Sequence, residues 1–190
     1  MKKIVGLVVF VMLLSTALWA KPMYKVNLAY GILTSPEIPE IILTKTTKGG
    51  IGAGAQVLFG EEKIKYGAEI AYMPIYNYKD DGLKAATGID IKNNMNAIPV
   101  LAVINYDLEE MGEMKPYLQG GLGLSFISAK SNTTGVEVTD NTSKFTFMLG
   151  AGMLKPLSDA LDLDISVKYY NIATEGDTSS EVVIGAGVCF

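Results

Sequence analysis

The chain has 190 residues, with 16 basic residues against 20 acidic ones and no histidine, which gives a formal net charge of −4 at pH 7. Every basic residue is a lysine, and an acidic chain without arginine is poorly suited to holding a phosphate backbone, which argues against nucleic-acid binding. The lack of histidine excludes Ser-His-Asp and Cys-His catalysis and His-ligated metals, while the lone Cys189 excludes an internal disulfide and a thiolate cluster.

The first twenty residues have the pattern of a secretory signal peptide. Two lysines after the initial methionine are followed by an apolar run, and the stretch ends on the small residue Ala20. The run is shorter than the roughly 20 apolar residues that a membrane-spanning helix needs. We therefore expect residues 1–20 to be a cleaved signal peptide, with Ala17 as the alternative cleavage point, and residues 21–190 to form one domain.

After Ala20 the dominant pattern has a period of two. Apolar residues alternate with polar or small residues, which is typical of β-strands with two different faces. No stretch sustains an apolar stripe with a 3.6-residue period, so no helix is predicted. In chain order, the alternation predicts eight strands over residues 24–32, 50–59, 64–72, 98–106, 117–126, 144–153, 161–170 and 181–190.

The connections between these strands alternate in length. The short, turn-like ones cover residues 60–63, 107–114 and 155–160, and the longer, polar ones cover residues 34–49, 76–95, 129–143 and 171–180. Short turns at one end and long loops at the other are typical of a transmembrane barrel whose short turns face the periplasm. Ile41-Ile42-Leu43 keeps the phase of the second strand, and Val136-Glu137-Val138 alternates, which indicates strands that extend outward beyond the bases of the four external loops.

Residue size indicates which face of each strand is inside. An eight-stranded barrel has an interior only just wide enough for side chains, and glycine weakens a strand without any gain on a solvent-facing surface. We therefore expect the glycine-rich faces inside and the apolar faces against lipid. The alternative is a soluble barrel whose apolar faces form an inner ligand cavity. The inward glycines are Gly50, Gly52, Gly54, Gly121, Gly123, Gly150, Gly152, Gly185 and Gly187.

The inner faces also carry balanced charges. Unpaired charges would be costly in such an interior, so we expect a plug of salt bridges and amides and not an open pore. Asp162 and Asp164 point the same way and could form a carboxylate pair or cation site, but pairing with lysines is expected to dominate. The predicted interior polar network is Lys25, Lys65, Glu69, Gln119, Lys144, Asp162, Asp164, Lys168 and Glu181.

Three stretches resemble a known family. The chain ends on an aromatic residue after apolar residues at alternate positions, which resembles the C-terminal signal read by the outer-membrane assembly machinery: Val182, Ile184, Ala186, Val188 and Phe190. The run Lys115-Pro116-Tyr117-Leu118-Gln119-Gly120-Gly121 and the acidic strand ending in Tyr169-Tyr170 are similar to strands of the OmpA/OmpX-type family of small barrels. The resemblance implies an all-β, eight-stranded antiparallel up-and-down transmembrane β-barrel in the bacterial outer membrane, with outer-membrane lipid and the barrel assembly machinery as partners.

The sequence leaves the function open between classes. We expect a non-enzymatic protein without cofactor or metal, with a structural or surface-interaction role in which external loops contact surface ligands. Extended strands such as 136–138 favour this role, because they offer edges to foreign strands. The alternative is a narrow channel or carrier for small or hydrophobic solutes, which the largely apolar inner face of residues 96–106 favours.

Overall fold

The computed structural model describes residues 22–35, 45–60, 63–79, 81–173 and 178–190. The expected signal peptide and Ile41-Ile42-Leu43 lie outside these ranges and stay predictions. In the described ranges the chain forms β1 (Met23–Ser35), β2 (Lys45–Lys48), β3 (Gly50–Phe59), β4 (Ile64–Lys79), α2 (Asp81–Thr87), β5 (Ile91–Asp107), β6 (Lys115–Thr133), β7 (Val136–Ser158), β8 (Leu161–Ala173) and β9 (Thr178–Cys189).

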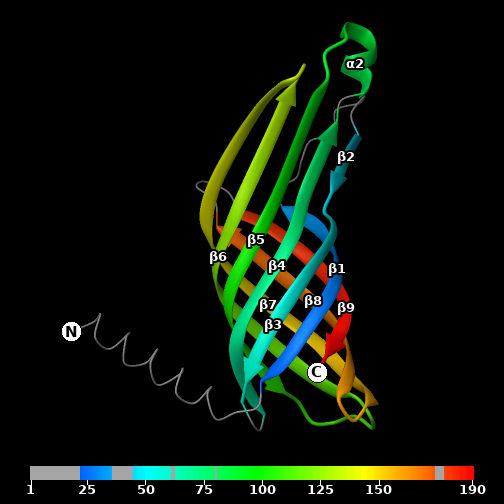
Figure 1. Cartoon of the computed structure of the whole chain (residues 1–190), viewed down its shortest axis with the longest axis vertical. Coiled ribbons are helices and arrows are strands. Elements are labelled where there is room, and N and C mark those ends of the chain that lie inside the picture. The colour runs from blue at the N-terminus through cyan, green and yellow to red at the C-terminus, as the bar shows by residue number, and fades with distance from the viewer. Residues whose placement is uncertain (1–21, 36–44, 61–62, 80, 174–177) are drawn as a thin grey trace, which may run out of the picture.

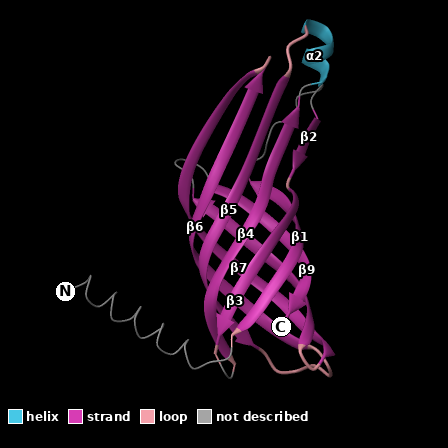
Figure 2. Ribbon diagram, viewed as in Figure 1, coloured by secondary structure: helices cyan, strands magenta, loops and turns pink. Residues whose placement is uncertain are grey.

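The strands close into a single antiparallel barrel (Figures 1 and 2). From β3 to β9 each strand pairs with the next along the chain, and β1 joins β3 to β9. β2 and β3 together occupy one position in the barrel, because both pair with β4. Gly49 separates them with a φ of 91°, a conformation that glycine adopts readily. The predicted eight-stranded up-and-down barrel is confirmed.

The apolar strand faces lie on the outside of the barrel. Leu28, Leu122 and Leu149 are 68 %, 58 % and 60 % exposed, whereas Glu69 and Lys168 are buried inside. A soluble barrel has the opposite arrangement, because its apolar side chains fill the core. The outside of this barrel is therefore suited to lipid, and the alternative of a soluble barrel with an apolar cavity is wrong.

Four neighbouring strands, β4 to β7, continue past the rim of the barrel as a curved sheet (Figure 1). β6 and β7 pair out to Thr133 and Val136, whereas β7 and β8 pair only from Thr146 and Ile172 onward. The ten residues of β7 from Val136 to Phe145 thus extend beyond the last residues shared with β8, a length of roughly 30 Å at the usual rise per residue. We call this part of β4–β7 the outer extension.

The outer extension corrects two predicted loops. Residues 76–95 and 129–143 were expected as long loops, but strand occupies both ends of the first and most of the second, which closes in a turn at Thr134 and Gly135. These two residues have φ angles of 49° and 85°. Left-handed residues at a two-residue turn match the twist of a hairpin, so the strands on either side stay paired. The expected extension around 136–138 is present.

The short helix α2 was also not expected. It connects β4 to β5 at the tip of the outer extension and ends at Gly88, whose N–H donates to the carbonyl of Lys84 at 2.9 Å. Gly88 has a φ of 76°, the left-handed conformation with which many helices end. No helix in the described residues is long and apolar enough to cross a membrane.

The interior is more apolar than expected. Besides charged groups, three buried apolar clusters lie among the inward side chains of the barrel. The inward positions of β5 contribute Leu101, Val103 and Ala97 to two of them, in line with the unusually apolar inner face of this strand. The clusters are Leu58, Met73, Leu101, Val103, Met148, Tyr170 and Val183; Leu33, Ile75, Ala97, Ile127 and Ile172; and Tyr117, Leu154 and Cys189.

The outward apolar face predicts that a new charge lowers the free energy of unfolding more at a lipid-facing position than in the outer extension. Leu122→Lys, in the middle of the lipid-facing part of β6, should lower the free energy of unfolding in lipid vesicles by about 2–4 kcal/mol. Val138→Lys, at an exposed position of the outer extension, serves as the control and should change it by less than about 0.5 kcal/mol. If urea unfolding shows equal losses of free energy for the two variants, the assignment of the lipid-facing side is wrong.

Candidate functional site

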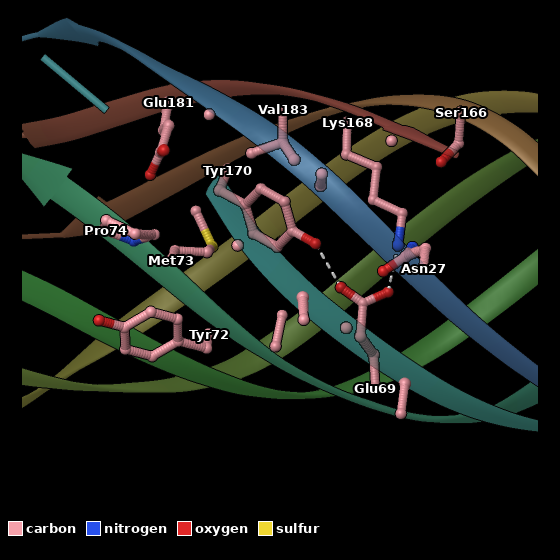
Figure 3. Close-up of a pocket in the computed structure, with 18 of the residues that line it drawn as sticks. Asn27, Glu69, Tyr72, Met73, Pro74, Ser166, Lys168, Tyr170, Glu181 and Val183 are labelled. Carbon is pink, nitrogen blue, oxygen red and sulfur yellow. Dashed lines mark hydrogen bonds and ion pairs between the residues drawn. The ribbon is translucent and has the colours of Figure 1, made fainter. Parts of the chain in front are cut away.

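The centre of the barrel is organised around Glu69 on β4. Its carboxylate accepts hydrogen bonds from the hydroxyl of Tyr170 and, at 2.6 Å, from Nζ of Lys168 (Figure 3). It also accepts one from Nε2 of Gln56. Gln56 lies directly opposite Glu69 in the β3–β4 ladder. Lys168 and Tyr170 are two residues apart on β8 and therefore point to the same side of that strand. Three donors thus satisfy one buried carboxylate, as a buried charge requires.

A second network lies toward the periplasmic end. Nζ of Lys25 is 3.7 Å from Oδ2 of Asp164 and 3.7 Å from the centre of the Tyr117 ring, and the Tyr117 hydroxyl donates to Oδ1 of Asp164 at 2.7 Å. This packing depends on Gly152, because a Cβ atom there would lie 2.5 Å from the Tyr117 hydroxyl. The glycine-rich inner face therefore makes room for specific large polar side chains.

The remaining predicted interior residues have different surroundings. Lys65 forms an ion pair with Asp107, which was not predicted, and Gln119 is buried. Lys144 and Asp162 are half-buried. Asp164 pairs with Lys25, so it does not form a carboxylate pair with Asp162.

Glu181 is the exception among the predicted residues. It is buried, and neither of its carboxylate oxygens accepts a hydrogen bond. The described residues contain no group of three or more His, Cys, Asp or Glu side chains that could hold a metal ion. Six of the nine predicted site residues thus fall into two paired networks, one rim pair and one buried acid without a hydrogen-bond partner.

Sequence reasoning missed several members of these networks. Gln56, Tyr117 and Tyr170 all occupy inward positions of their predicted strands, so the period-two pattern placed them correctly but did not single them out. Asp107 lies just after the predicted strand 98–106. The pattern shows which way a side chain points, and the partner that it meets depends on the stagger between strands.

Together, the networks and clusters fill most of the barrel. The cluster of Leu33, Ile75 and Ile172 lies toward the outer end, the Glu69 network lies in the middle, and the Lys25 network lies toward the periplasmic end. A small cavity of about 20 Å³ lies in the outer half of the barrel between β1, β3, β4, β8 and β9. Among the described residues, the polar interior is thus divided by apolar packing.

The outer extension has one unpaired edge. From Val136 to Phe145, β7 pairs with β6 on one side, and in the described residues no strand pairs with its other side. Val136 and Val138 are 67 % and 61 % exposed. The edge therefore presents unpaired backbone groups and apolar side chains together.

The tip of the outer extension is fixed by ion pairs. Oδ2 of Asp90 lies 3.0 Å from Nζ of both Lys84 and Lys92, so α2 is tied to the start of β5. Hydrogen bonds from Lys92 and Lys84 hold the pKa of Asp90 below its usual value. Lys130 and Glu137 form a looser pair across the β6–β7 hairpin, at 3.7 Å.

Comparison with known proteins identifies the family. Residues 7–190 match the family model described as the outer membrane protein beta-barrel domain. The chain belongs to this family. It is therefore a bacterial outer-membrane β-barrel, as the resemblance implied, and its outward apolar strands span that membrane. A comparison with curated proteins found no matching sequence.

Solved structures with the same fold cover nearly the whole chain. Neisserial surface protein A is 16 % identical with a TM-score of 0.53 over 88 % of this chain and 95 % of its own. Ail of Yersinia pestis, in complex with the heparin analogue sucrose octasulfate, is 14 % identical with a TM-score of 0.52 over 90 % and 99 %. A major outer membrane protein of Thermus thermophilus is 13 % identical with a TM-score of 0.55 over 90 % and 99 %.

The last strand has the expected pattern of an assembly signal. Ile184 on β9 and Phe190 directly after it are 52 % and 56 % exposed on the lipid-facing side, and the other alternating positions, Val182, Ala186 and Val188, share their phase. Glu181, Val183 and Cys189 face the interior. Recognition of this strand by the assembly machinery stays a prediction.

The Glu69 network predicts that the stability of the barrel depends strongly on the pairing of Glu69 with Lys168. Glu69→Leu leaves the buried ammonium of Lys168 without its partner and should lower the free energy of unfolding by about 3–5 kcal/mol. The double variant Glu69→Leu/Lys168→Met removes both charges and should recover most of this loss. Urea unfolding in detergent micelles measures both, and Glu137→Gln, which breaks an exposed pair, is the control with an expected loss below about 1 kcal/mol. A Glu69→Leu loss as small as that of the control would contradict the central role of Glu69.

Proposed function

We propose that this protein is a non-enzymatic surface-interaction protein whose filled barrel holds the outer extension rigidly above the membrane. The observation that carries the proposal is the unpaired edge of β7 between Val136 and Phe145. An extended segment of a partner adds to this edge as a further strand, with main-chain hydrogen bonds supplying affinity.

The edge lacks the features that usually prevent strand addition. Natural edge strands are protected by proline, by lysine or by an irregular bulge. Residues 136–145 contain no proline, their one lysine, Lys144, lies at the barrel end of the edge, and β6 and β7 keep one register throughout the outer extension. The long, regular and unprotected edge therefore supports a binding role.

The charges of this edge indicate the chemistry of the partner. The segment 136–143 has two charged residues, Asp140 and Glu137, the latter in a loose pair with Lys130. They are three positions apart and lie on opposite faces of the strand, so a partner strand with basic side chains on either face meets one of them. The related fold of Ail was solved with a heparin analogue. This chain has no arginine, and Lys130 is already paired with Glu137, so we do not propose a polyanionic ligand for it.

The main test shortens the unpaired edge from residues 136–145 to residues 140–145 and leaves the barrel in place. Replacing residues 130–139 with Asn-Gly keeps the pair of Ala129 and Asp140 and closes it with a tight hairpin turn. A fluorescent peptide of about ten residues with alternating valine and lysine, a typical strand length, should bind the intact protein and lose at least about tenfold in affinity for the shortened one, as measured by anisotropy.

Two controls make this test specific. A Gly-Ser linker in place of α2 alters the same end of the molecule but leaves the β7 edge, so peptide binding should persist. A peptide of the same length in which the central residue is proline should bind neither protein, because proline lacks the N–H that the strand ladder needs. Equal peptide binding by the intact and shortened proteins, both shown to be folded by heat-modifiable migration on gels, would refute the proposal.

The filled interior supports this role over that of a conduit. Three apolar clusters and two ion-pair networks occupy the space along the barrel. Purified protein in planar bilayers should therefore show no steady conductance, whereas the double variant Ile75→Ala/Ile127→Ala, which thins the outer apolar cluster, should show brief openings. A steady conductance of the intact protein would favour the channel alternative.

A further inference from the structure

The cavity in the outer half of the barrel contains a buried acid whose charge is not balanced by a direct contact. Glu181 points into this cavity from β9 (Figure 3). Its side chain is 3 % exposed, and neither Oε1 nor Oε2 accepts a hydrogen bond. A carboxylate taken out of water without a partner costs several kcal/mol, so this position favours either a bound positive charge or a proton.

The fold makes room for this carboxylate instead of displacing it. Gly31 on β1 lies beside Glu181, and a Cβ atom at Gly31 would be only 1.7 Å from Oε1. Any other residue at Gly31 would therefore push the carboxylate away from its present place. The glycine and the glutamate together form a built feature of the cavity wall.

Besides the Glu181 oxygens, the fully buried side-chain atom of the lining that lacks a hydrogen bond is also an oxygen. Oε1 of Gln56 accepts no hydrogen bond, while its Nε2 donates to Glu69. Two buried nitrogens without hydrogen-bond partners, on Lys25 and Gln119, belong to residues outside this lining. Lys168, the cation of the lining, lies 2.6 Å from Glu69. In the described residues, the fully buried atoms of the lining that lack a hydrogen bond are thus all oxygen acceptors.

We propose that this cavity binds one small monovalent cation, such as Na⁺ or K⁺, with the Glu181 carboxylate as its anionic ligand. Oxygen ligands suit such hard cations, and a single carboxylate balances a single positive charge. A single carboxylate leaves half of a divalent charge unbalanced in a buried site, and the described residues provide no group of three or more His, Cys, Asp or Glu side chains that could hold such an ion.

The strand pairing beside Glu181 offers a route for the ion. Leu33 pairs with Glu181 and Ser35 with Ser180, so the β1–β9 register shifts by one residue next to the site. The Thr34 hydroxyl donates to the carbonyl of Ser180 at this shift. An irregular, hydroxyl-bearing seam of this kind opens more easily than a regular ladder.

The test compares cations at equal ionic strength. Unfolding of the intact barrel in detergent micelles is followed in NaCl, KCl, CaCl₂ and tetramethylammonium chloride at pH 8. A ligand that binds only the folded state at ten times its dissociation constant lowers the unfolding constant about tenfold. We expect this gain in Na⁺ or K⁺ relative to tetramethylammonium, abolished in Glu181→Gln and retained in the matched control Glu137→Gln.

A direct measurement keeps the test decisive if Glu181→Gln does not fold. The ²³Na line of a solution of the intact protein should broaden saturably and sharpen again when Li⁺ or K⁺ is added. Three results would overturn the proposal: no difference between either alkali cation and tetramethylammonium, stabilisation by Ca²⁺ alone, or an unchanged cation effect in folded Glu181→Gln. The first, combined with stability that rises on acidification to pH 5, would assign a proton to Glu181 instead.

Discussion

The structure depends on the pairing of its first and last strands. In lipid no water is available to backbone N–H and C=O groups, so a sheet can cross the membrane only if it closes on itself. β1 and β9 provide that closure, and at their ends Tyr24 and Phe190 exchange both backbone hydrogen bonds, at 2.8 and 2.9 Å. Their rings lie 5.9 Å apart, so the same pair contributes aromatic surface at the barrel end.

Closure of eight strands then forces the interior to be packed. Few side chains fit, so each large inward group needs a small one beside it, as Tyr117 needs Gly152 and Glu181 needs Gly31. The same crowding brings Glu69 and Lys168 together although 99 residues separate them in the chain. A filled barrel is a rigid base, and this rigidity allows β4 to β7 to continue into the outer extension.

Much of the fold could be predicted from the sequence, but the detailed contacts could not. Alternation placed Lys25, Glu69 and Lys168 inside and Leu122 outside. It could not show that Lys65 meets Asp107 at the rim, because that depends on where each strand starts. It also underestimated the outer extension, since polar residues such as those at 129–133 suit loops and exposed strands equally well. The helix α2 is too short to give a periodic signal.

The sequence by itself determined the two-faced strands, their even number and the side that meets lipid. These properties are local: a period of two, the placement of glycine and the charge of each position decide them before any strand finds its neighbour. Only the tertiary structure decided which lysine meets which carboxylate and left Glu181 facing a cavity. Those outcomes depend on the stagger of eight strands around a closed barrel, which brings together residues far apart in the chain and which no single segment encodes.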